Sequence, residues 1–216
     1  MDYVGDGKVE KVILKLGGSL IEEGWDIIRV LRDYAKTKHR RIIIIPGGGP
    51  FAEVVRKCPD TLSEDAAHWM AVLAMDQYGL FLANGELPVV ERLAEIDGAG
   101  QFCILLPYHI LKAYDCLPHT WDVTSDTIAA FIANELGEKT FIKLTDVDGL
   151  LDEKGNLITA MRAEELVNKG TGGCVDAALP DFLIRYEMSC VIINGKFPNR
   201  VIDVIEGNET QGTKLA

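Results

Sequence analysis

The sequence has little that is typical of a secreted or membrane protein. Its five cysteines form no CxxC pair, and their odd number does not favour a disulfide framework. No segment reaches the roughly 18 uncharged apolar residues that a membrane-spanning helix requires, and the first residues, MDYVGDGKVEK, contain no long apolar stretch. We therefore expect a cytoplasmic protein with no membrane partner.

Positive charge is also scarce. The 216 residues include 22 Lys and Arg against 33 Asp and Glu, which gives a formal net charge of -11. Such a chain is not expected to bind nucleic acid, because its acidic surface repels a phosphate backbone. A site that handles phosphate groups must then concentrate its positive charge locally.

A metal centre is not predicted either. Cys116 and His119 have a spacing that metal ligands can have, and His109 is nearby. No second pair of ligand residues completes a tetrahedral site, so buried or isolated side chains are the simpler interpretation.

Two glycine-rich turns are the most informative features that the sequence does have. Each follows an apolar, β-branched run: KVILKLGGSL at 11–20, with Lys15 just before the glycines, and RIIIIPGGGPF at 41–51. Glycine lets the backbone approach an anion closely and point several N–H groups toward it. Neither turn fits G-x-x-x-x-G-K-[ST] or G-x-G-x-x-G. Two anion cradles side by side favour a small-molecule kinase, which moves a phosphoryl group between two anionic molecules.

Apolar runs of strand length alternate with amphipathic stretches of helix length, a pattern typical of a parallel sheet covered on both faces. We expect one domain over residues 1–216, a three-layer α/β/α sandwich with a mainly parallel central sheet. The predicted strands are 11–16, 41–46, 102–106, 140–145 and 190–194, and the predicted helices are 25–38, 50–57, 64–83, 125–136, 163–168 and 176–186. Ligands of such sheets bind beyond the carboxyl ends of the strands, where both glycine turns lie.

Two further signals refine this prediction. Asp148-Gly149 and Lys154-Gly155-Asn156 flank short apolar pieces, so a hairpin or excursion is expected after Thr145. Pro50 suits the first position of a helix, which favours a helix that opens at the GGG turn.

Several motifs in order resemble the amino acid kinase family, whose members include acetylglutamate, aspartate, uridylate and isopentenyl phosphate kinases. The motifs cover nearly the whole chain: KLGGSL, PGGGPF, DVTSDTIAAFIA at 122–133, KLTDVDGLL at 143–151, TGGCVDAALP at 171–180, IINGKFPNRV at 192–201 and GTKL at 212–215. The resemblance implies ATP and Mg²⁺ as cofactors, a small-molecule phosphate acceptor and a homo-oligomer.

The resemblance also implies roles for individual residues. Lys15 corresponds to the lysine that contacts the transferring phosphoryl group, and Asp126 to the aspartate that orients it; Asp126 could also cap its helix. The acceptor loop corresponds to Gly47, Gly48 and Gly49. Residues that correspond to the nucleotide side are Gly17, Gly18, Ser19, Thr145, Asp146, Asp148, Gly149, Gly172 and Gly173.

The chain departs from the family pattern at one position. Many members have a second lysine in a GGMxxK pattern, whereas Cys174-Val175-Asp176 follows the TGG turn here. Lys143 and Lys196 each end an apolar run and are both candidates to replace it. The sequence does not choose between them, and the missing lysine also leaves open a non-catalytic nucleotide- or oxyanion-binding protein with a storage or regulatory role.

The segment EDAAHWMAVLAMDQYG at 64–79 resembles family members associated with methanofuran biosynthesis. This implies the acceptor [5-(aminomethyl)furan-3-yl]methyl phosphate, with Asp76 as a candidate carboxylate for its ammonium group. His68 in this segment is interpreted as a core residue. Uridylate, isopentenyl phosphate and acetylglutamate remain alternative acceptors, although Phe51-Ala52-Glu53 stands where isopentenyl phosphate kinases usually have a histidine.

Overall fold

The computed structural model describes residues 9–38, 40–58, 61–169 and 173–216. Their strands form one eight-stranded sheet in the order β3-β4-β2-β1-β5-β7-β8-β6, in which every pair is parallel except β7 with β8. The strands are β1 (Glu10–Leu16), β2 (Arg40–Pro46), β3 (Val89–Val90), β4 (Phe102–Leu105), β5 (Thr140–Thr145), β6 (Ala160–Met161), β7 (Ser189–Asn194) and β8 (Thr213–Leu215).

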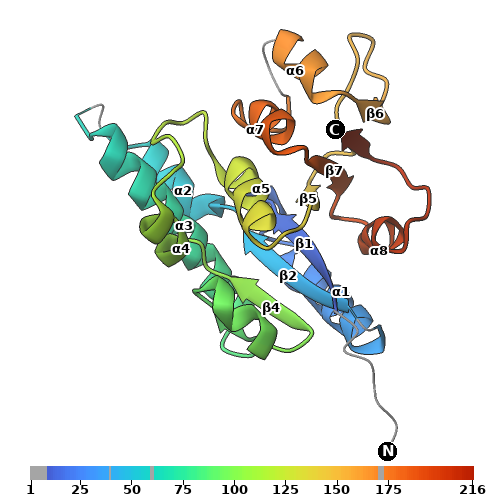
Figure 1. Cartoon of the computed structure of the whole chain (residues 1–216), viewed down its shortest axis with the longest axis horizontal. Helices are drawn as coiled ribbons and strands as arrows, with labels where there is room; N and C mark the ends of the chain where they lie inside the picture. Colours follow the sequence, from blue (N-terminus) through green and yellow to red (C-terminus); the bar gives the residue numbers. More distant parts are fainter. Residues whose placement is uncertain (1–8, 39, 59–60, 170–172) are drawn as a thin grey trace, which may run out of the picture.

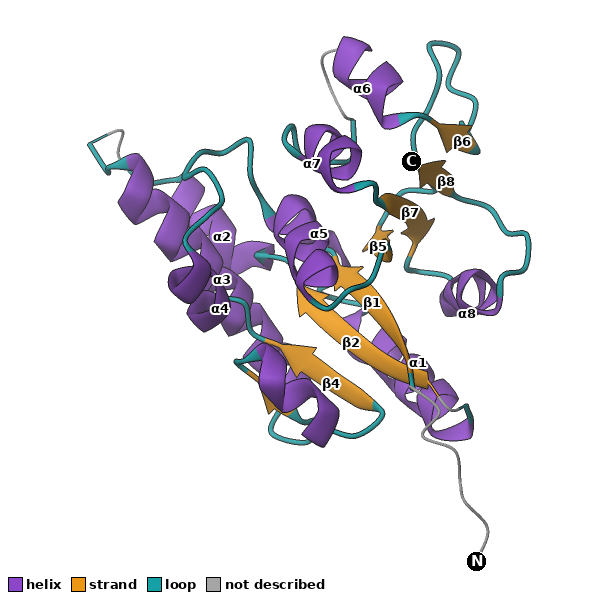
Figure 2. Cartoon of the chain, viewed as in Figure 1, coloured by secondary structure: helices purple, strands orange, loops and turns teal. Residues whose placement is uncertain are grey.

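Helices cover both faces of this sheet (Figures 1 and 2). One face packs against α5 and α7, and the other against α1, α8 and part of α3. The helices are α1 (Gly24–Thr37), α2 (Gly49–Arg56), α3 (Glu64–Ala83), α4 (Tyr108–Tyr114), α5 (Ser125–Glu135), α6 (Ala163–Lys169), α7 (Leu179–Tyr186) and α8 (Pro198–Glu206), with 3₁₀ turns at Gly18–Leu20 and Leu93–Gly98. The predicted three-layer α/β/α fold is confirmed.

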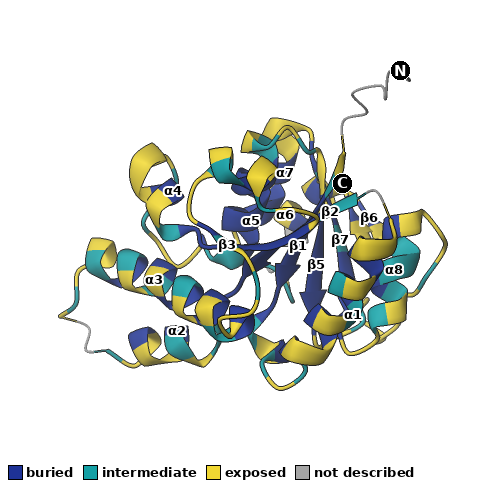
Figure 3. Cartoon of the chain, turned by 90° about the horizontal axis from the view of Figure 1, so that it is seen from below, coloured by how far each residue is buried: buried dark blue, intermediate teal, exposed yellow. Residues whose placement is uncertain are grey.

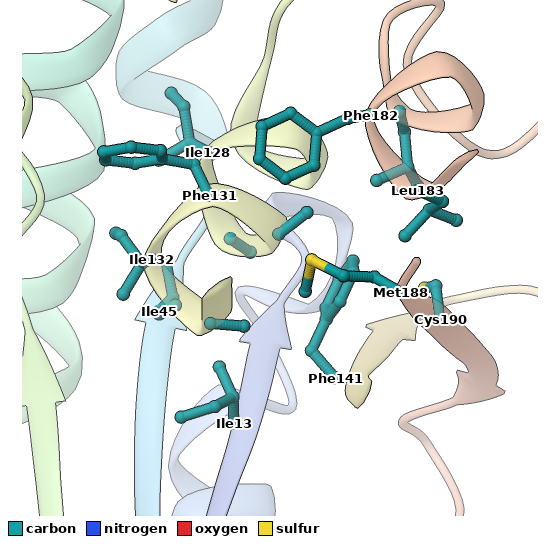
Figure 4. Close-up of a cluster of buried hydrophobic side chains, with 14 of the residues drawn as sticks. Ile13, Ile45, Ile128, Phe131, Ile132, Phe141, Phe182, Leu183, Met188 and Cys190 are labelled. Carbon is teal, nitrogen blue, oxygen red and sulfur yellow. The ribbon is translucent and has the colours of Figure 1, made fainter. Parts of the chain in front are cut away.

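The central strands are buried on both faces, which explains their unbroken apolar sequences (Figure 3). Figure 4 shows one of the two cores, in which Phe131 and Ile132 of α5, Phe141 of β5 and Phe182 of α7 meet. Because α5 is apolar on most of its surface and packs against β1, β5 and α7, its first turn is held at the carboxyl ends of β1 and β5.

Some predicted boundaries were wrong. The helix predicted from Asp176 begins at Leu179, with Ala178 as its N-cap residue; Asp176 precedes it, and its carboxylate accepts a hydrogen bond from Leu179 N. The helix at the GGG turn begins at Gly49, one residue before Pro50. The excursion after Thr145 is present: Leu151 and Leu157 form an antiparallel bridge.

Candidate active site

The two glycine turns lie against each other. Strands β1 and β2 are neighbours with Leu16 opposite Pro46, so both turns leave the same edge of the sheet. Their contact is close: a Cβ built on Gly18 would lie 2.4 Å from Cα of Gly49, and one on Gly47 would lie 3.0 Å from the backbone N of Gly18. The two predicted anion cradles therefore touch through backbone that only glycine allows.

The Gly47–Gly49 turn packs against α3. Gly49 has a φ of +52°, a conformation that favours glycine, and its Cα faces the ring of Tyr78. Tyr78 is fully buried beneath it. The Gly47–Gly49 turn is therefore in contact with the Tyr78 ring and with the Gly17–Ser19 turn, and both contacts fix its position.

A buried charged cluster lies at the same edge of the sheet. Lys15 of β1 and Lys143 of β5 are opposite each other in the parallel pairing, and both side chains reach Asp126 in the first turn of α5. Lys15 Nζ lies 2.8 Å from Asp126 Oδ1, and Lys143 Nζ donates to Asp126 Oδ2 and to the carbonyl of Cys174. One carboxylate therefore holds two ammonium groups side by side.

The protonation of this cluster follows from burial and charge. Burial opposes the charged form of Asp126, but Lys15 and Lys143 outweigh it and lower the pKa of Asp126 to about 2. Burial lowers the pKa of Lys15, and the charge of Lys143 lowers it further. Burial also opposes the charged form of Lys143, yet Asp126 raises its pKa overall. Two lysines therefore share the Asp126 carboxylate at this edge of the sheet, which is where a phosphate-handling site needs local positive charge.

Asp176, which no sequence motif marks as a site residue, supports the cluster although it lies 50 positions after Asp126. Its carboxylate accepts hydrogen bonds from the backbone N–H and hydroxyl groups of Thr124 and Thr127, and from Leu179 N. Its own backbone N–H donates to Asp126 Oδ2 at 3.1 Å. The cap of α5 is therefore Asp176, and Asp126 itself pairs with the lysines instead of capping its helix.

Lys196, the other candidate for the second lysine, lies outside the cluster. Its Nζ is 3.4 Å from Glu23, and its side chain is 45% exposed. Lys143, by contrast, is buried beside Lys15.

Both aspartates predicted for the nucleotide side, Asp146 and Asp148, have hydrogen-bond partners within the protein. Asp146 lies near the first turn: burial opposes its charged form, but hydrogen bonds from Ser19 and Thr145 outweigh this and lower its pKa. The Asp148 carboxylate accepts hydrogen bonds from Asn194, Arg200 and Gln211 at 2.8–3.1 Å.

The remaining nucleotide-side glycines are placed as follows. A Cβ on Gly149 would lie 2.3 Å from Thr213 Oγ1, so this glycine is required for packing. Gly173 has a φ of +59°, and Gly172 lies outside the described residues.

A pocket opens beside the Gly47–Gly49 turn. Gly48 and Ser125 line it together with Arg56, Glu64, His68 and Trp121. It lies between α2, α3 and the start of α5, and it gives the Gly47–Gly49 turn an adjoining space in which a small molecule can bind.

Asp76 is not among the residues that line this pocket. Its Oδ1 accepts a hydrogen bond from Tyr108 N at the start of α4, at 3.2 Å. Burial, which the hydrogen bond only partly offsets, raises the pKa of Asp76 to about 6. The structure thus gives Asp76 a partner in α4, and a role in acceptor binding stays a prediction.

Within the described residues, no group of three or more His, Cys, Asp or Glu side chains is arranged to hold a metal ion. None of the helices in this part of the chain is long and apolar enough to cross a membrane.

Comparison with known proteins gives consistent results. The profile of the amino acid kinase family matches residues 72–194. The [5-(aminomethyl)furan-3-yl]methyl phosphate kinase of Methanocaldococcus jannaschii is 35% identical over 211 residues, covering 94% of this chain and 96% of that protein. The uridylate kinase of Methanocella arvoryzae is 24% identical over 220 residues, covering 91% and 96%.

Solved structures show the same fold. The uridylate kinase of Archaeoglobus fulgidus has a TM-score of 0.72 at 18% identity, covering 96% of this chain and 100% of that one. The UMP kinase of Ureaplasma parvum has a TM-score of 0.73 at 16% identity, with 97% of both chains covered. This chain belongs to the amino acid kinase family and is a phosphotransferase.

Proposed function

We propose that the protein transfers the γ-phosphoryl group of ATP to a small phosphomonoester and forms a diphosphate, and that the acceptor is [5-(aminomethyl)furan-3-yl]methyl phosphate. The observation that carries the proposal is the pair of ammonium groups of Lys15 and Lys143, held on Asp126 beside two glycine turns in contact. The acceptor follows from the 35% identity to the M. jannaschii kinase over nearly both full lengths.

In the proposed reaction, an oxygen of the acceptor phosphate attacks the γ-phosphorus of ATP. The new P–O bond forms as the bond from the γ-phosphorus to the β,γ-bridging oxygen breaks, and ADP leaves with that electron pair. The Gly17–Ser19 turn holds the donor phosphates, and the Gly47–Gly49 turn holds the acceptor phosphate. Lys15 and Lys143 stabilise the charge on the moving group, and Asp126 fixes both of them.

The other nucleotide-side residues keep their proposed places. Thr145, Asp146, Asp148, Gly149, Gly172 and Gly173 would surround the ribose and base. Asp148 would act there by holding Asn194 and Arg200, since its own oxygens are occupied.

Mg²⁺ is proposed to enter with the nucleotide. The described residues offer no cluster of metal ligands, so ATP phosphates would hold the ion. When bound, Mg²⁺ partly neutralises the charge of the donor phosphates.

A turnover assay tests the proposal. ADP release is measured with the aminomethylfuran phosphate, UMP, isopentenyl phosphate and acetylglutamate in parallel. We expect the highest kcat/KM with the furan phosphate. Faster turnover of another acceptor would reassign the substrate, and tight ATP binding without transfer to any of them would favour the non-catalytic binder. The adjacent lysine pair argues for catalysis, because a storage protein has no need to focus two ammonium groups on one point.

We further propose that the chain acts as one domain in a homo-oligomer in the cytoplasm, where ATP is supplied. The single sheet supports one domain. Helix α3 supports an oligomer, because Met70, Leu73 and Leu80 on one of its faces are 38%, 41% and 55% exposed.

A further inference from the structure

The pocket beside the acceptor turn contains two unused polar groups one helical turn apart. Glu64 and His68 are at i and i+4 of α3, so their side chains lie on the same face of the helix. Both line the pocket that Gly48 and Ser125 also line. A molecule whose phosphate lies at the Gly47–Gly49 turn can therefore extend toward them.

His68 is nearly buried but lacks a partner. It is 8% exposed, and no residue in the described ranges makes a hydrogen bond with either of its ring nitrogens. Its ring stacks on that of His119, with the centroids 4.2 Å apart and the planes 16° from parallel. Because His68 lines the pocket, a ring nitrogen without a protein partner is free to accept a hydrogen bond from a ligand there.

Burial and the neighbouring His119 both keep His68 uncharged. Its two ring nitrogens lie 2.8 Å from Asp65 Oδ1 and 3.0 Å from Asp115 Oδ1, and hydrogen bonds to these carboxylates raise the pKa of His119. Burial, followed by the charge of His119, lowers the pKa of His68 to about 4. His68 is therefore neutral at physiological pH, and one of its nitrogens offers a lone pair.

Glu64 carries the uncompensated charge of the pocket. The positive groups that line the pocket have carboxylates of their own: Arg56 pairs with Glu53, and His119 with Asp65 and Asp115. Over the ranges that the structure describes, no ion pair is recorded for Glu64. What remains is one free carboxylate one turn from one free imidazole lone pair, a set of acceptors suited to a group with several N–H donors.

We infer that Glu64 and His68 form the subsite for the ammonium group of the acceptor and determine its specificity for amine-bearing phosphomonoesters. This inference rests on the proposed function. An ammonium group has three donors, so it can bind the Glu64 carboxylate and the His68 ring nitrogen together. The pocket face of α3 then distinguishes the amine acceptor from nucleotides and isoprenoid phosphates, which lack an ammonium group.

The test compares two acceptors that differ only in the amine: [5-(aminomethyl)furan-3-yl]methyl phosphate and its 5-methyl analogue. The variants are Glu64→Gln, which removes the charge at an exposed position, and His68→Phe, which keeps the aromatic stack but removes the lone pair. Glu86→Gln is the matched control, because Glu86 is also exposed and lies just beyond the C-terminal end of α3.

We expect the wild-type protein to prefer the amine acceptor in kcat/KM. Glu64→Gln should raise the KM for the amine acceptor about 10- to 100-fold, with little change in kcat, and leave the KM for the 5-methyl analogue within about twofold. His68→Phe should reduce the same preference, whereas Glu86→Gln should keep it.

Two outcomes would overturn the inference while leaving the proposed function intact. One is a wild-type protein that uses both acceptors equally well; the other is a Glu64→Gln variant whose KM is unchanged for the amine acceptor or rises equally for both. If the wild-type protein turns over neither furan phosphate, the proposed acceptor itself is wrong, and the ammonium subsite is rejected with it.

Discussion

Lys143 and Lys196 end neighbouring strand-like runs, yet their surroundings differ in charge and solvent. Lys143 is buried on Asp126 opposite Lys15, while Lys196 is half exposed beside Glu23. A charge that stabilises a transition state acts most strongly where water is excluded. At the scale of single residues, we therefore propose Lys143 as the second catalytic charge.

Replacing Lys143 by Met should lower kcat about 100- to 1,000-fold, because one preorganised charge donor is lost. The fold should persist, since Asp126 keeps Lys15 as its partner. Lys196→Met is the matched control and should change kcat by less than about threefold. Single-turnover rates with saturating ATP, together with melting curves, make the comparison. Equal losses in both variants would contradict the assignment.

Gly18→Ala tests the contact between the two turns. The added methyl group would lie 2.4 Å from the backbone of Gly49, so the turns must separate. Such overpacking costs about 1–3 kcal/mol of stability, and because both phosphates lose their alignment, kcat should fall more steeply than ATP affinity.

Gly98→Ala provides the control for this substitution, because no atom lies within 4 Å of its added Cβ. It should leave kcat unchanged and keep or slightly raise the melting temperature. A Gly18→Ala variant with wild-type kcat would show that the spacing of the turns does not matter for transfer.

At the scale of elements, α5 depends on a residue from another part of the chain. The Asp176 carboxylate caps its first turn, and the Asp176 backbone N–H holds Asp126 in place. Removing the cap therefore affects both the helix and the charged cluster.

Asp176→Asn should destabilise the protein by about 1–3 kcal/mol, since an amide cannot accept all the hydrogen bonds that the carboxylate accepts. It should also lower kcat, because Asp126 gains freedom to move. Urea unfolding and kcat measurements check both effects, with exposed Asp181→Asn as the control. If stability falls but kcat does not, Asp176 supports the helix alone.

The sequence predicts some elements well and others not at all, for physical reasons. Strand β5 and helix α3 were predicted with their full bounds, because a β-branched run or a capped apolar segment is a local signal. Strands β3 and β6 have two residues each, too short to show a period, and helices α4 and α8 were not predicted either.

The candidate site shows the same division. Lys15, Asp126 and the glycines were found because they lie in recognisable motifs. The choice of Lys143 needed the order of strands in the sheet, and the cap by Asp176 joins residues about 50 positions apart. Neither relationship is visible in local sequence.

At the scale of the whole molecule, the proposed oligomer rests on the exposed apolar side chains of α3. Leu73 and Leu80 lie on the side of α3 that faces solvent, and Met70 extends the same stripe. Monomeric proteins rarely keep such a stripe in water.

Leu73→Glu should convert the proposed oligomer to monomers, because it places a charge in the middle of the stripe. Light scattering after size-exclusion chromatography measures the mass. Ile184→Glu is the control, as Ile184 of α7 is similarly exposed at 40% but lies elsewhere. A wild-type protein that already runs as a monomer would refute the proposed association.

The contact between Gly18 and Gly49 limits how new acceptors can be accommodated. The two turns have no room for larger residues at these positions, so substitutions there disturb the common chemistry before they alter selectivity. The neighbouring helix has side chains free to vary along its pocket face. Redesign, whether by selection in nature or in the laboratory, should therefore retain the glycines and randomise positions on α3.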